Sequence, residues 1–133
     1  MQRVDGRLRW RAAAVGDSCL FVVRGGEIAA ALPVCRAADF GFTPDLIPTL
    51  RRLCPKVRFV TAEGLGKLGD LYGLATDALA QYLLRSHETR EPIDWQRYWD
   101  MDGGAWRAEL ARLRESGRIA NDDATLVLLR VSG

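Results

Sequence analysis

The sequence has few of the residues from which catalytic and metal sites are most often built. Its 133 residues include one histidine, His87, and three cysteines, Cys19, Cys35 and Cys54, which form no Cys-x-x-Cys pair. This spacing argues against a disulfide framework and a zinc site, and the lone histidine argues against a hydrolytic triad. We therefore expect the cysteines to be small buried residues in a reducing compartment, and His87 to lie at the surface near a helix end.

Lysine and long apolar runs are also scarce. Lys56 and Lys67 are the only lysines, and the 19 basic residues are balanced by 17 acidic ones to give a net charge of +2. No basic stripe interleaved with aromatic residues is present, so nucleic-acid binding is not expected. No segment reaches the roughly 18 apolar residues of a membrane span, and the N-terminus lacks the apolar core of a signal peptide. We expect a soluble, cytoplasmic protein with no membrane partner.

The length and the 48% hydrophobic content fit a single domain over residues 1–133. Alternating polarity predicts strands at 7–15, 19–24 and 27–32, the last two joined by a tight hairpin at Gly25-Gly26. Further strands are expected at 56–62, 71–76 and 125–131, with a glycine-rich turn at 63–70. Helices are expected at 77–88, 93–100 and 104–117. Strands followed by helices and one closing strand indicate an α+β fold with a mostly antiparallel sheet.

Two acidic residues lie next to the ends of two of these strands. Asp77 follows the strand expected at 71–76, and Asp122 precedes the strand expected at 125–131. If the two strands are antiparallel neighbours, both carboxylates emerge at one rim of the sheet, where they would attract a cation such as Mg²⁺ or Mn²⁺. The alternative is that Asp77 is only a helix N-cap and that residues 121–123 form only an Asx turn.

Three stretches of the sequence, taken in order, resemble a known enzyme family. They are AAAVGDSCLFVVRGGE (12–27), GLATDALAQYLL (73–84) and NDDATLVLLRV (121–131). In this order they are similar to motifs in the C-terminal half of the metal-dependent Ser/Thr protein phosphatases of type 2C. The similarity runs from about Trp10 to Val131, and LPVCRAADFGFTPDLI (32–47) looks like the bacterial branch of that family.

The resemblance implies a structure and an activity. The fold would be part of an αββα sandwich, a mostly antiparallel sheet with helices packed on one side. Asp77 and Asp122 would be ligands of Mg²⁺ or Mn²⁺, and Asp17 would be a structural turn residue near the site. The substrate would be a phosphoprotein, hydrolysed by metal-bound water, because two cations lower the pKa of bridging water and neutralise the phosphoryl oxygens.

The sequence also departs from the family's pattern. The N-terminal half, with its Asp-Gly-x-Gly metal motif and an arginine for the phosphate, has no counterpart. Cys19 replaces the arginine of the first motif, and Ala78 replaces the glycine of the second. We therefore expect the chain to be inactive alone.

Three alternatives remain open at this level. The chain is part of a phosphatase that another segment or chain completes, a pseudophosphatase that serves as a binding or structural module, or a small α+β domain unrelated to phosphatases. Half of a sandwich exposes strand edges and an apolar sheet face. The first two alternatives therefore predict self-association or a complementing chain.

Overall fold

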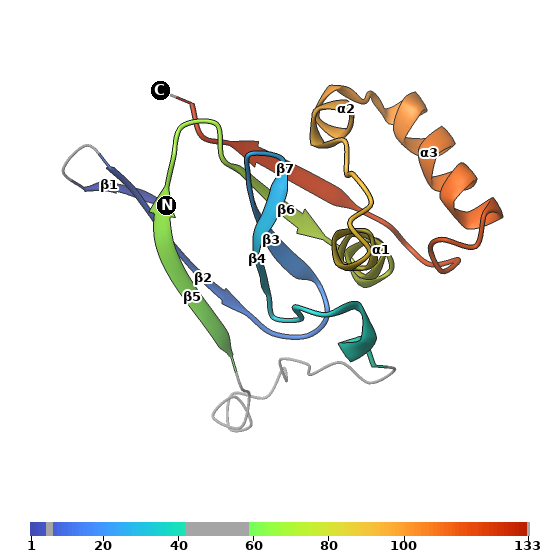
Figure 1. Ribbon diagram of the computed structural model, residues 1–133, viewed down its shortest axis with the longest axis horizontal. Coiled ribbons are helices and arrows are strands. Elements are labelled where there is room, and N and C mark those ends of the chain that lie inside the picture. Colours follow the sequence, from blue (N-terminus) through green and yellow to red (C-terminus); the bar gives the residue numbers. More distant parts are fainter. Residues whose placement is uncertain (5–6, 42–58, 133) are drawn as a thin grey trace, which may run out of the picture.

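The strands of the protein form two antiparallel sheets, seen in a computed structural model that describes residues 1–4, 7–41 and 59–132 (Figure 1). The three-stranded sheet has the order β1-β2-β5, and the four-stranded sheet has the order β4-β3-β6-β7. Their bounds are β1 (Gln2–Val4), β2 (Arg7–Ala14), β3 (Cys19–Arg24), β4 (Glu27–Leu32), β5 (Val60–Gly66), β6 (Leu71–Ala75) and β7 (Leu126–Arg130). Residues 45–53, DLIPTLRRL, whose sequence could form a turn or two of helix, lie outside the described residues.

The helices lie on one side of the four-stranded sheet (Figure 1). They are α1 (Asp77–Glu88), α2 (Trp95–Asp100) and α3 (Gly103–Glu115), with a short 3-10 helix, η1 (Ala37–Asp39), beside α1. The main core forms where α1 packs on this sheet, and Phe21, Leu79 and Leu83 are fully buried in it. The expected α+β fold, with helices packed on one side of an antiparallel sheet, is confirmed.

A second, smaller core joins the two sheets. Trp10 of β2 packs against Val22 of β3 and Tyr72 of β6, all three of which are buried. The rings of Trp10 and Tyr72 meet edge to face, with their centroids 5.9 Å apart. Alternation along β3 explains the two cores, because Phe21 faces α1 whereas Val22 faces the three-stranded sheet.

Several locally encoded features are confirmed. Gly25 and Gly26 have φ angles of 59° and 84°, as the tight hairpin between β3 and β4 requires. Helix α1 spans the predicted residues, and α3 ends just before Gly117, whose φ is 68°. His87 lies in the last turn of α1, as expected.

The sequence predicted a glycine-rich turn over residues 63–70, but residues 63–66 belong to strand β5. Strand β5 continues to Gly66 and pairs with β2 over its whole length. A Cβ atom at Gly64 would lie 2.9 Å from the Trp10 ring, and one at Gly66 would lie 2.8 Å from the Tyr72 hydroxyl. These glycines therefore permit close packing against a strand. In the sequence they cannot be distinguished from the glycines of a turn.

This packing gives a prediction for Gly64. Replacing it with alanine forces the Trp10 ring out of the core between the sheets, so we expect the free energy of unfolding to fall by about 1–3 kcal/mol. Gly73→Ala is the matched control, because a Cβ there meets its nearest neighbour, Leu128, at an ordinary 3.4 Å. Urea denaturation followed by tryptophan fluorescence compares the two, and equal losses would contradict the proposed role of Gly64.

Other expectations from the sequence need correction. Strand β1 was missed, since three residues are too few to show a pattern. Cys19 is buried as expected, but Cys35 is exposed, and Cys54 lies outside the described residues. In the parts of the chain described, no helix has the length and apolar character needed to cross a membrane.

Candidate functional site

The end of β6 adjoins the start of β7, as the placement of the two predicted metal ligands requires. The strands are antiparallel neighbours, with Ala75 opposite Leu126. The backbone N–H of Thr76 donates to the Thr125 carbonyl at 3.2 Å. The Thr76 hydroxyl donates to the Asp123 carbonyl at 3.2 Å and accepts from the Thr125 N–H at 3.0 Å. Thr76 thus fastens the segment before β7 to the start of α1, and we call residues 76–77 and 122–125 the β6–β7 rim.

Asp77 is the first residue of α1 and is half-buried. A carboxylate at this position is stabilised by the helix dipole. The N-cap is Thr76, with φ −69° and ψ 162°, so the expectation that Asp77 itself is the N-cap was wrong by one residue. The hydroxyl of Thr76 bonds toward β7 and makes no capping bond to the helix.

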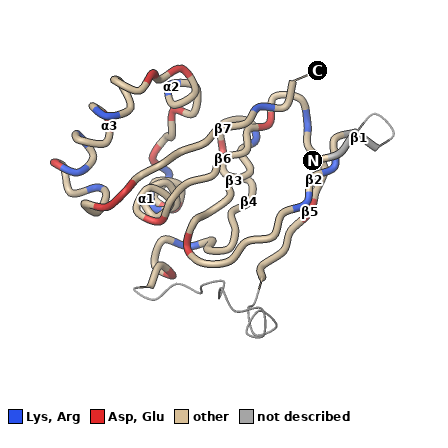
Figure 2. The backbone as a smooth tube through the Cα atoms, turned by 180° about the vertical axis from the view of Figure 1, so that it is seen from behind, with Lys and Arg blue, Asp and Glu red and all other residues tan. Residues whose placement is uncertain are grey.

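Asp122 lies in the exposed segment between α3 and β7, which Figure 2 shows as an acidic stretch of the backbone. Its Oδ1 atom accepts a hydrogen bond from the N–H of the next residue, Asp123, at 2.7 Å, whereas an Asx turn is closed by the N–H two residues on. Its carbonyl accepts from Arg114 of α3 at 2.6 Å. The backbone around Asp122 is thus held on two sides, by α3 and by Thr76.

Asp17 and Cys19 lie at the same end of the sheet, beside the rim. Cys19 begins β3 and is opposite Ala75 at the end of β6. Burial, with smaller contributions from the nearby carboxylates of Asp17 and Asp77, raises the pKa of the Cys19 thiol to about 11. The thiol therefore stays protonated at neutral pH and is not a nucleophile. Asp17 sits in the turn before β3, as expected of a structural turn residue.

The rim is incomplete as a metal site in the described part of the chain. No group of three or more His, Cys, Asp or Glu side chains there is placed to hold a metal ion. Hard cations can be bound by one or two carboxylates with water as the other ligands, as is usual for Mg²⁺. Asp77 and Asp122 could supply such a partial ligand set, and further ligands would have to come from elsewhere.

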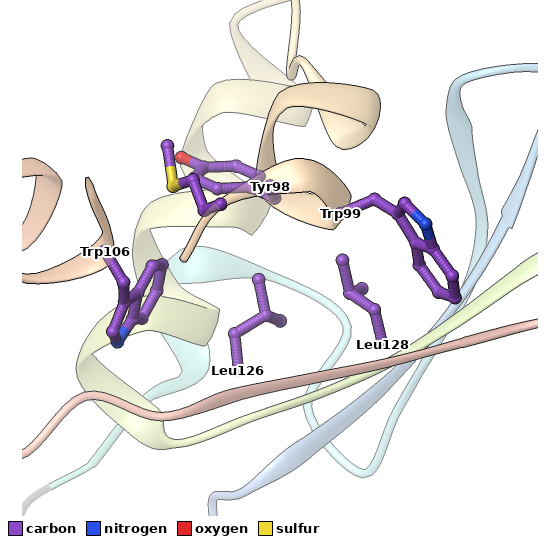
Figure 3. Close-up of a pocket in the computed structure, with 6 residues that line it drawn as sticks. Tyr98, Trp99, Trp106, Leu126 and Leu128 are labelled. Carbon is purple, nitrogen blue, oxygen red and sulfur yellow. The ribbon is translucent and has the colours of Figure 1, made fainter. Parts of the chain in front are cut away.

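Sequence reasoning missed a pocket between α2, α3 and β7. It has a volume of about 300 Å³ and is lined by Tyr98, Trp99, Met101, Trp106, Leu126 and Leu128 (Figure 3). The Tyr98 and Trp106 rings meet edge to face at 6.2 Å, and the Arg130 guanidinium lies 4.3 Å from the centre of the Trp99 ring. The aromatic residues of 95–106 were a signal for it, but only contact with β7 creates the pocket.

No match to a known protein accompanies this geometry. No family model matches the chain, and neither a curated protein nor a solved structure does. The functional interpretation therefore depends on the sequence motifs and on the geometry of the rim.

Proposed function

We propose that this chain is a type 2C Ser/Thr protein phosphatase-like domain that lacks the N-terminal metal and phosphate motifs and is inactive by itself. One observation supports the proposal most. β6 ends at Ala75, opposite Leu126 where β7 begins, so Asp77 follows and Asp122 precedes two adjoining strand ends, as a shared rim requires. Asp77 and Asp122 are distant in sequence, so nothing in the local sequence requires them to lie beside neighbouring strands.

In this proposal Asp77 and Asp122 hold Mg²⁺ or Mn²⁺ together with water and with ligands from a completing segment. A bound cation would supply an activated water molecule and neutralise the phosphoryl oxygens of a phosphoprotein substrate. Thr76 would position the segment that carries Asp122, because its three hydrogen bonds fix residues 123–125 relative to the first turn of α1. In this proposal the missing motifs would supply the other ligands and a phosphate-binding arginine, since no group of three His, Cys, Asp or Glu side chains within the described residues is placed to hold a metal ion.

A metal titration tests the two carboxylates. We expect the isolated chain to bind Mn²⁺ weakly, and Asp77→Asn and Asp122→Asn each to weaken binding several-fold, because one of two anionic ligands is lost. The loss of the free Mn²⁺ electron-spin-resonance signal measures binding. Asp94→Asn is the matched control, since asparagine also caps α2 and the charge removed lies at the start of another helix. Equal binding by the wild type and both rim variants would refute the ligand assignment.

Hydrolysis of p-nitrophenyl phosphate tests the expected inactivity. The isolated chain should show no Mn²⁺-dependent turnover above buffer. Turnover that disappears in Asp77→Asn would show instead that the chain is an active enzyme as it stands.

A second candidate function, a pseudophosphatase that acts as a binding or structural module, is favoured by an exposed apolar surface. Leu74, Val127 and Leu129 are 47%, 45% and 50% exposed. Leu74 is opposite Val127, so these side chains form one patch on the sheet. Apolar patches of this kind mark interaction surfaces. Self-association or a complementing chain is therefore part of either proposal.

A further inference from the structure

Strand β7 has the sequence of a central strand but lies at the edge of its sheet. Its first four residues, Leu-Val-Leu-Leu, are all apolar, which is typical of a strand that is buried on both faces. In the structure β7 is last in the order β4-β3-β6-β7, and none of its side chains is fully buried. Natural edge strands are usually blunted by charges, prolines or bulges. Here the only charge within β7 is Arg130, at its end.

The backbone of β7 presents a row of hydrogen-bonding groups at this edge. Thr125 and Val131, on either side of β7, bond toward β6 and the turn that precedes it: Thr76 N–H donates to Thr125, and Val131 exchanges bonds with Gly69 and Asp70. Successive residues of a strand point their N–H and C=O groups in opposite directions. The groups of Leu126, Leu128 and Arg130 therefore point to the free edge.

Both faces of β7 beside this edge are apolar. Val127 and Leu129 extend the exposed patch that Leu74 begins. This patch is on the face of the four-stranded sheet toward the three-stranded sheet, which covers β3 and β6 but leaves these three side chains exposed (Figure 1). Leu126 and Leu128 lie on the opposite face, where they line the aromatic pocket (Figure 3). An added strand would cover apolar side chains on both faces at once.

We propose that β7 pairs with the β7 of a second copy of this chain, antiparallel about a two-fold axis at Leu128. The charges that flank the strand favour an antiparallel copy over a parallel one. Asp122 and Asp123 precede β7 and Arg130 ends it, so an antiparallel copy places the basic end of one strand toward the acidic end of the other. A two-fold contact uses the same surface on both copies, so the apolar side chains of one β7 strand would pack against those of the other.

The register follows from the backbone directions. Leu128 of one copy lies opposite Leu128 of the other, and Leu126 lies opposite Arg130, so that each pair exchanges both backbone hydrogen bonds. Val127 lies opposite Leu129 of the second copy, which enlarges the apolar cluster around Leu74. This inference stands apart from the phosphatase proposal, because it needs no metal, substrate or active site.

Sedimentation equilibrium of the full chain without metal tests the dimer. We expect the wild type to have twice the 14.8 kDa mass of one chain. Val127→Lys should weaken the dimer by roughly 100-fold or more, because an inward-pointing charge blocks edge pairing. Val60→Lys is the matched control: Val60 is 43% exposed and also lies in an edge strand, β5, but should leave the dimer intact. A wild type that stays monomeric at about 1 mM overturns the proposal.

Cysteine cross-linking tests the register, in a background of Cys35→Ser and Cys54→Ser that leaves only the buried Cys19. Opposite residues in a hydrogen-bonded antiparallel pair have Cα atoms about 5.5 Å apart, within reach of a disulfide. Leu128→Cys should therefore link two chains on mild oxidation, whereas Leu126→Cys alone should not. A dimer that persists in Val127→Lys and is not linked through position 128 associates through another surface, which would also overturn the proposal.

Discussion

Replacing Arg24 with methionine is expected to lower the free energy of unfolding by about 3–5 kcal/mol, the cost of leaving a buried charge without its partner. Asp70 is only 2% exposed. Arg24 binds its carboxylate through two hydrogen bonds, Nε to Oδ1 at 3.0 Å and Nη2 to Oδ2 at 2.6 Å. In the variant only the backbone N–H of Lys67, 2.8 Å from Oδ2, would remain among these donors.

The position of the pair makes the loss larger than that of a local contact. Arg24 ends β3, and Asp70 lies in the turn between β5 and β6. Arg24 also donates to the Leu65 carbonyl of β5 at 3.0 Å. This one side chain thus connects the four-stranded sheet to the turn and to a strand of the other sheet, so its removal loosens the connection between the sheets.

An exposed ion pair provides the control for Arg24→Met. Arg9 and Glu63 lie 3.2 Å apart on β2 and β5, with side chains 54% and 51% exposed. Arg9→Met should cost no more than about 1 kcal/mol, because water already screens this pair. Urea denaturation near pH 7 compares the two variants. Similar losses would show that the burial of Asp70 does not control the effect.

Lowering the pH is expected to remove about 3 kcal/mol of stability through Glu109 alone, by the free energy of its pKa shift. Hydrogen bonds from Arg112, and then from Arg97, lower the pKa of this buried carboxyl from 4.5 to about 2, against the opposing effect of burial. A lowered pKa in the folded state means that the stabilisation is complete above the pKa of the unfolded chain. It is therefore lost as the pH falls from about 4.5 to about 2.

Glu109→Gln should flatten this part of the pH profile. The variant is expected to be less stable than the wild type at pH 6, with the difference closing toward pH 2 as the wild-type carboxyl becomes protonated. Some acid sensitivity should remain, because Arg24 also lowers the pKa of Asp70. Glu115→Gln, an exposed change on the same helix, should leave the profile as in the wild type. A constant difference between wild type and Glu109→Gln from pH 6 to pH 2 would contradict the assignment.

The sequence by itself determined the features that depend on neighbouring residues. The hairpin at Gly25-Gly26, the limits of α1 and the end of α3 before Gly117 follow from backbone preferences and periodicity over a few residues. These features need no knowledge of how distant segments pack. The adjacency of β6 and β7 was only a condition of the argument for a shared rim, and the structure meets that condition.

Tertiary structure alone decided the rest, because contacts between distant residues leave no local pattern. From the sequence, Gly64 and Gly66 were assigned to a turn. The structure shows that they allow the side chains of Trp10 and Tyr72 to pack closely against β5. Thr76 carries no sequence signal for the bonds that it makes across the rim to residues 123–125. The run of apolar residues in β7 is typical of a strand buried on both faces, but its place beside β6 leaves one edge open, since no strand of the described chain follows it in the sheet.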